Sequence, residues 1–283
     1  MPRSDSTTLV SVNWLADHLA APDVRVLDAS WHMPHTGRDA KAEYLAEHIP
    51  GATFFDIDDI ADERSALPHM VPPMEKFVSR VRKLGVGDGH RIVVYDSLGL
   101  MSAARVWWMF RYFGHDDVAV LDGGLPKWKA EGHPVEDMPP MARERHFTPR
   151  IRSMMLKDVT EVSQAVKLGD VEIVDARSPE RFRGTVEEPW PGLRSGRIPG
   201  SKNVPFASLL NEDGTMKDEA GLRAAFEAGG VEIDRPVITS CGSGVTAAIL
   251  LLALERLGAR MTALYDGSWS EWGASEMLPV ETG

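Results

Sequence analysis

Residues 24–30 read VRVLDAS, and residues 171–177, which lie 147 positions further along the chain, read VEIVDAR. Three more pairs follow in the same order, at offsets of 149, 145 and 144: HIPG from His48 with RIPG from Arg197, RIVVYDS from Arg91 with PVITSCG from Pro236, and LDGGLPKW from Leu121 with YDGSWSEW from Tyr265. Such nearly constant spacing indicates two copies of one domain, because the repeats of a solenoid are far shorter. The chain therefore carries an internal duplication.

Each copy alternates short runs of β-branched residues with stretches of helical periodicity, such as SVNWLADHLA at residues 11–20. This alternation predicts the α/β class, with a parallel sheet flanked by helices in each copy. Residues 133–153 are rich in proline and charge and lack periodicity, which is typical of a linker. We predict an N-terminal domain over residues 1–140, a linker over 141–155 and a C-terminal catalytic domain over 156–283.

The composition, with 43% hydrophobic and 26% charged residues, is that of a globular protein with a full core. A formal net charge of −11 argues against nucleic-acid binding, which requires a basic surface. The polar start MPRSDSTT lacks the apolar core of a signal peptide, and the chain has no apolar stretch long enough to span a membrane. We therefore expect a cytoplasmic protein that binds neither nucleic acid nor membrane.

The chain has a single cysteine, Cys241, which excludes an intramolecular disulfide and a four-cysteine metal site. This residue follows the strand-like PVITS, opens the loop CGSGVT and precedes an apolar helix. Gly242 and Gly244 allow the loop amides to turn toward one point, and the N-terminus of the helix adds positive potential there. We expect the loop to favour the thiolate and to hold a persulfide that external molecules can reach, without a metal or an organic cofactor.

The alternative is an inert cysteine in the core, with the two glycines as ordinary turn formers. The equivalent position in the first copy is Asp96, a residue that an apolar pocket would not accept comfortably. Polar surroundings are therefore expected at this position in both copies.

The loop from Cys241 to Ala247 resembles that of the 3-mercaptopyruvate sulfurtransferases, and the likeness continues through HIPGATFFDID, RVWWMF and RFRGT over nearly the whole chain. On these motifs the chain is identified as a member of the rhodanese superfamily. The resemblance implies two rhodanese domains, of which the first lacks the cysteine and is inactive. It further implies transfer of sulfur from 3-mercaptopyruvate through a Cys241 persulfide, with release of pyruvate. Because no second cysteine is present, the acceptor is expected to be external: cyanide, a small thiol, or a dithiol protein such as thioredoxin.

The resemblance also assigns roles to individual residues. Ser243 would donate a hydrogen bond to the substrate, and Arg181 would bind its carboxylate. His48 and Asp39 would polarise the loop serine and assist proton transfer. The remaining predicted pocket residues are Gly242, Gly244, Val245 and Thr246. Alternative roles are left open: Ser243 or Thr246 as a helix cap, and His48 and Asp39 as structural residues.

The chain departs from the family pattern at Trp190, where related sequences often carry a second carboxylate-binding arginine. Either Arg194 or Arg197 substitutes for it, or the substrate binds with one charge-assisted bond fewer, a loss of about 1.5–3 kcal/mol. Two further arginines of this segment, Arg177 and Arg183, are expected to pair with glutamates on the surface.

The sequence also bears on three other functions. A phosphatase on the same fold would need Cys-x5-Arg, but the required position is Ala247, which argues against this function. Retention of Cys241 in a complete glycine loop disfavours a non-catalytic binding module. A thiosulfate-preferring enzyme remains the alternative, although such enzymes place Arg-Lys where this chain has Gly242 and Ser243.

Overall fold

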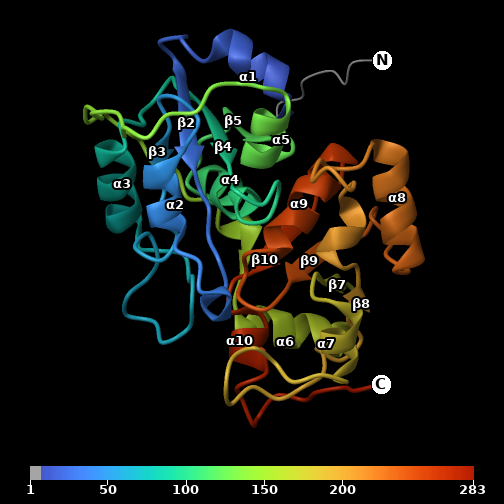
Figure 1. Ribbon diagram of the computed structural model, residues 1–283. Helices are drawn as coiled ribbons and strands as arrows, with labels where there is room; N and C mark the ends of the chain where they lie inside the picture. Colours follow the sequence, from blue (N-terminus) through green and yellow to red (C-terminus); the bar gives the residue numbers. More distant parts are fainter. Residues whose placement is uncertain (1–7) are drawn as a thin grey trace. The chain divides into compact units, whose positions relative to one another are not determined.

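A computed structural model describes residues 8–283, which form two compact units (Figure 1). The first unit contains the chain up to Asp62 together with Val71–Arg152 and Asn211–Met216. The second contains Glu63–Met70, Ser153–Leu210 and Lys217–Gly283. Two short segments, 63–70 and 211–216, thus pack with the unit that chain order alone would not give them.

The first unit is built on a parallel five-stranded sheet in the order β1-β5-β4-β2-β3. Its elements are β1 (Leu9–Val10), α1 (Val12–His18), β2 (Val24–Asp28), a 3-10 turn (Pro34–Thr36), α2 (Ala40–Ala46), β3 (Thr53–Phe54), α3 (Met74–Lys83), β4 (Arg91–Tyr95), α4 (Ala103–Tyr112), β5 (Val118–Leu121) and α5 (Gly124–Ala130). Figure 1 shows β2, β4 and β5 side by side, as their pairing requires.

The second unit repeats this topology with the order β6-β10-β9-β7-β8, again parallel throughout. Its elements are a 3-10 turn (Ser153–Met155), β6 (Leu156–Lys157), α6 (Val159–Leu168), β7 (Glu172–Asp175), α7 (Pro179–Arg183), β8 (Lys202–Asn203), a 3-10 turn (Phe206–Leu209), α8 (Glu219–Ala228), β9 (Val237–Ser240), α9 (Ala247–Arg256), β10 (Thr262–Tyr265) and α10 (Ser268–Trp272). The predicted fold class, two α/β domains with parallel sheets flanked by helices, is therefore confirmed.

Local sequence explains why these elements form. The central strands β4 and β9 are β-branched runs buried on both faces, as the strands of a parallel sheet covered by helices must be. Helix α6 begins at a capping box, in which Asp158 accepts from the N–H of Glu161 and the Glu161 carboxylate accepts from the N–H of Asp158. It ends at Gly169, whose φ of +66° lies in the left-handed region that favours glycine.

Each unit has its own apolar core between sheet and helices. In the first, Val93, Tyr95 and Trp128 are among the fully buried members of one cluster. In the second, Tyr265, Trp269 and Trp272 play the equivalent part. None of the helices described between residues 8 and 283 combines the length and the apolar character that crossing a membrane requires.

Candidate functional site

Cys241 lies directly after β9 and shortly before α9, at the carboxyl edge of the second sheet. Its N–H donates to the Oγ of Ser268 over 3.2 Å, and its carbonyl accepts from the N–H of Trp269 at 3.0 Å. Both partners belong to α10, which follows the neighbouring strand β10. This edge is where open α/β sheets place their ligands, so the cysteine loop is the candidate site.

The side chain of Cys241 is buried in this structure, with 2% of the residue exposed. The expectation that external molecules reach the sulfur freely is therefore wrong for this conformation. Two neighbouring segments pack against the loop. Helix α10 is bonded to it through the Ser270 N–H, which donates to the Gly242 carbonyl at 2.8 Å, and the segment 63–70 contacts Ser243. Some of these side chains must move before a donor reaches the sulfur.

Ser243 contacts a histidine that the sequence analysis did not select. Its Oγ lies 3.0 Å from Nδ1 of His69, and both residues are at least nine-tenths buried. His69 belongs to the segment 63–70 of the second unit and has a φ of +60°, which is uncommon for a residue other than glycine. Strain of this kind persists where the surroundings impose it and is concentrated at functional sites. His69 is therefore a candidate site residue.

The sequence predicted Asp39 and His48 as the partners of the loop serine, and the structure gives each of them partners within the first unit. Asp39 caps α2, where its Oδ1 accepts from the N–H of Ala42 at 3.0 Å. His48 is fully buried, with Nδ1 2.7 Å from the carbonyl oxygen of Tyr44 and its ring stacked on the Tyr44 ring. Its Nε2 lies 3.6 Å from Oε1 of Glu136. This geometry favours the structural roles that the sequence left open for both residues.

The first unit shows what the loop does when an anion fills it. Asp96 occupies the position equivalent to Cys241 and is 1% exposed. Its carboxylate accepts four backbone hydrogen bonds of 2.7–2.9 Å, from the N–H groups of Leu98, Met101, Ser102 and Ala103. This loop is therefore an anion-binding nest, and the polar surroundings expected at the position are present in the first unit.

The two loops share the feature that shapes the nest. Gly99 and Gly244 hold equivalent positions with φ of +105° and +77°, a conformation that residues with a Cβ rarely adopt. The amides of the second loop that correspond to those around Asp96 belong to Ser243, Thr246, Ala247 and Ala248. Thr246 occupies the N-cap position of α9, but its side chain makes no capping hydrogen bond. Val245 is buried beside it with 3% exposure.

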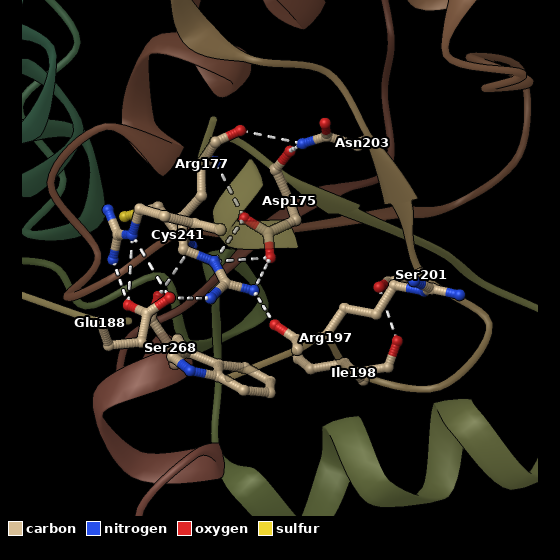
Figure 2. A network of polar contacts seen from close by, with 12 residues as sticks. Asp175, Arg177, Glu188, Arg197, Ile198, Ser201, Asn203, Cys241 and Ser268 are labelled. Atoms are coloured by element: carbon tan, nitrogen blue, oxygen red, sulfur yellow. Dashed lines mark hydrogen bonds and ion pairs between the residues drawn. The ribbon is translucent and has the colours of Figure 1, made fainter. Parts of the chain in front are cut away.

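Beside the loop lies a network of buried charges (Figure 2). The Arg177 guanidinium sits between two carboxylates, 2.7 Å from Oδ2 of Asp175 and 2.7 Å from Oε1 of Glu188. It also lies over the Trp269 ring, 4.3 Å from the ring centroid. Burial lowers the pKa of Arg177, but the adjacent Asp175 and Glu188 carboxylates outweigh this effect and raise the pKa above its usual value. The prediction that Arg177 pairs on the surface is wrong, because its side chain is fully buried.

The Arg181 guanidinium lies against the cysteine loop. An added Cβ on Gly242 would lie 3.1 Å from Nη2 of Arg181, so the absence of a side chain at Gly242 lets the guanidinium lie against the backbone. Nη2 donates to Oε2 of Glu188 at 2.5 Å, and the side chain is 25% exposed. Arg181 is thus positioned by a buried carboxylate and remains partly open to solvent, as a substrate-binding arginine requires.

Arg194 instead binds the backbone of its own unit. Its guanidinium donates to four carbonyl oxygens between residues 272 and 278, three of them at 3.0–3.1 Å. The other possible substitute, Arg197, pairs with Glu281 at 3.3 Å and lies over the Phe182 ring. The geometry therefore favours structural roles for both arginines over the substrate contact considered for them.

We expect Arg194→Ala to lower the free energy of unfolding by about 3 kcal/mol, because it leaves several half-buried carbonyl oxygens without donors. Urea unfolding measures this loss. Arg183→Ala, which removes an exposed arginine of the same unit, serves as the matched control and is expected to change stability by less than about 0.5 kcal/mol. Equal stability of the two variants would contradict a structural role for Arg194.

Comparison with known proteins agrees with the fold described above. The Rhodanese-like domain family matches residues 11–131 and 158–275. The 3-mercaptopyruvate sulfurtransferase of Escherichia coli is 44% identical over 277 residues, covering 98% of each chain, and the thiosulfate sulfurtransferase of Bos taurus is 44% identical over 271 residues, covering 93% of this chain and 91% of the relative. The crystal structure of SseA from Escherichia coli, described as a 3-mercaptopyruvate sulfotransferase, matches with a TM-score of 0.86 and 42% identity over 93% of this chain and 99% of that chain. The protein therefore belongs to the rhodanese family, of which it carries two domains in tandem.

Proposed function

We propose that the protein is a sulfurtransferase that moves sulfane sulfur from 3-mercaptopyruvate to an external acceptor through a persulfide on Cys241, and releases pyruvate. The observation that carries this proposal is the arrangement around the chain's only cysteine: a glycine loop of the anion-binding type, whose serine is bonded to a buried histidine. No step requires a metal or an organic cofactor.

In the first half-reaction the Cys241 thiolate attacks the sulfur of the donor. A sulfur–sulfur bond forms, the carbon–sulfur bond of the donor breaks, and its electron pair leaves on pyruvate as the enolate. The proton of the donor thiol then completes the methyl group of pyruvate, which leaves Cys–S–S⁻ on the protein. The amide cradle seen around Asp96 in the first unit supports this step, because an equivalent cradle stabilises the terminal sulfur anion.

Ser243 and His69 act on the leaving group. Negative charge develops on the ketone oxygen of 3-mercaptopyruvate as the enolate forms. Within the cysteine loop, the Ser243 hydroxyl is the side-chain hydrogen-bond donor nearest in sequence to the nucleophile. The 3.0 Å contact between Ser243 Oγ and His69 Nδ1 lets the imidazole orient that hydroxyl. Arg181 binds the carboxylate and so sets the direction in which the donor enters.

We expect Ser243→Ala and His69→Ala each to lower kcat by about a hundredfold, since each removes one member of the same hydrogen-bonded pair. The double variant should be no slower than either single variant, because coupled residues are not additive. Asp39→Asn is the control: asparagine keeps the α2 cap, and turnover should stay unchanged. Strictly multiplicative losses in the double variant would contradict the pairing.

The donor is tested by comparing kcat/KM for 3-mercaptopyruvate and for thiosulfate with the same acceptor, cyanide. The 3-mercaptopyruvate and thiosulfate sulfurtransferases named above are equally similar to this chain, at 44% identity each. The expected preference for one sulfur donor is therefore argued from the cysteine loop. Gly242 and Ser243 offer no side-chain cation, whereas a sulfonate group would need one. We expect 3-mercaptopyruvate to be preferred at least tenfold. A preference for thiosulfate would support the alternative function instead.

The persulfide must be discharged by a molecule from outside, because the sequence has no second cysteine to resolve it. We propose a small thiol or a dithiol protein such as thioredoxin as acceptor, and a cytoplasmic location for the reaction. Because Cys241 is buried, donor and acceptor reach the sulfur in a more open conformation of the loop surroundings.

A further inference from the structure

Each unit has the same kind of turn after its second strand, β2 or β7, but the two turns carry different side chains. After β2, the N–H of Ser30 donates to Oδ1 of Asp28 at 2.8 Å; after β7, the N–H of Arg177 donates to Oδ1 of Asp175 at 2.9 Å. The residue after each aspartate, Ala29 or Ala176, donates its N–H to the carbonyl oxygen of the last residue of the neighbouring central strand. These acceptors are Tyr95 in β4 and Ser240 in β9, each at 2.8 Å. Ser30 and Arg177 are therefore structurally equivalent, and the first unit lacks the arginine.

A second difference lies opposite this turn. Leu125 in α5 occupies the position that Trp269 holds in α10. In the second unit the Arg177 guanidinium stacks on Trp269 and bonds to Asp175. Serine and leucine fill less space than arginine and tryptophan, and the first unit has a cavity of about 520 Å³ at this place, lined by Asp28, Ser30 and Leu125 among others.

The charges around the cavity leave one acid without a cation. At its wall, Arg38 is paired with Glu43 at 2.7 Å and Lys129 is paired with Glu47. Among residues 8–283, no ion pair reaches the remaining carboxylate, Asp28, which is 1% exposed.

Asp28 is satisfied only by neutral donors. Ser30 and the Tyr95 hydroxyl hydrogen-bond to it. Burial raises the pKa of Asp28 despite these bonds, and the nearby Asp96 carboxylate raises it further. A cation that enters the cavity would supply the charge that Arg177 supplies to Asp175.

We propose that the cavity of the first unit binds a small guanidinium compound, with its planar N–H groups on Asp28 and its body against Leu125. The second unit provides the template, because its own arginine makes both contacts within the chain. This site lies in the unit without the cysteine and is independent of the sulfur-transfer proposal.

The test measures binding of methylguanidinium chloride to the full chain, with ligand-observed NMR at constant ionic strength as the readout. We expect a dissociation constant in the millimolar range, on the order of 5 mM. Methylurea, which has nearly the same shape without the charge, should not bind measurably.

Two variants locate the site. Ser30→Arg places a guanidinium in the first unit on the turn equivalent to that of Arg177, and Asp28→Asn removes the negative charge. Each variant is expected to weaken binding at least tenfold. Urea unfolding verifies that both variants are folded, by a readout that does not depend on the proposed sulfur transfer. Equal affinity of native protein and Ser30→Arg, equal binding of methylurea, or no binding to the native protein would each overturn the proposal.

Discussion

Replacing Cys241 by serine is expected to lower pyruvate release from 3-mercaptopyruvate by at least about 10³-fold, the largest effect of any single substitution in this protein. The reason is that the hydroxyl of serine is a far weaker nucleophile than a thiolate at neutral pH, and no other thiol in the chain can take over. Steady-state assay of pyruvate with cyanide as acceptor measures the loss.

Ser240→Ala is the matched control. Ser240 is the preceding residue, equally buried, and its Oγ has no hydrogen-bond partner within the described part of the chain. Its loss should leave turnover within about twofold, because it removes no interaction with the loop. A Cys241→Ser protein that retained a tenth of native activity would remove Cys241 from the mechanism.

Glu188→Gln is expected to give the largest loss of stability, about 3–5 kcal/mol in the unfolding of the second unit. Its side chain is fully buried and accepts from Arg177 at 2.7 Å and from Arg181 at 2.5 Å. A neutral amide leaves only the Asp175 carboxylate beside the buried Arg177 and removes the carboxylate that holds Arg181, so the network keeps an excess of positive charge. Urea unfolding, monitored by tryptophan fluorescence, measures the change in the free energy of unfolding. The signal is suitable because Trp269 lies against Arg177.

The neighbouring Glu187 provides the comparison, since it carries the same charge but is exposed. Glu187→Gln should change stability by less than about 0.5 kcal/mol. If both variants lost the same amount, net charge rather than the buried network would explain the effect. The Glu188 variant should also raise KM for 3-mercaptopyruvate, because Arg181 loses the contact that holds it over Gly242.

The fold could be predicted from the sequence because its signals are local. The strands β2 and β7 lie in the repeated runs VRVLD and VEIVD, in which apolar and β-branched residues predict a buried strand. The chemistry of the loop could be anticipated for the same reason, since strand, cysteine, glycines and helix are consecutive. Asp96 then gave the polar character of the position from within the chain.

The contacts that the sequence did not reveal depend on distant parts of the chain. His69 is 174 positions from Ser243, in the stretch LPHMVPP, which is none of the repeated motifs, and the family resemblance pointed to His48 instead. The burial of Arg177 likewise follows from packing on Trp269, far along the chain. Nor did any spacing rule indicate that the Arg194 guanidinium binds carbonyls more than seventy residues away.

The central claim is that sulfur rests on Cys241 between the two half-reactions, and intact-mass spectrometry tests it most directly. Native protein is incubated with excess 3-mercaptopyruvate without acceptor and separated from the donor, and its intact mass is measured. The mass is measured again after treatment with cyanide. We expect a gain of one sulfur atom that maps to the peptide containing Cys241 and disappears with cyanide. Pyruvate released with no gain in protein mass, or a gain that persists in Cys241→Ser, would contradict it.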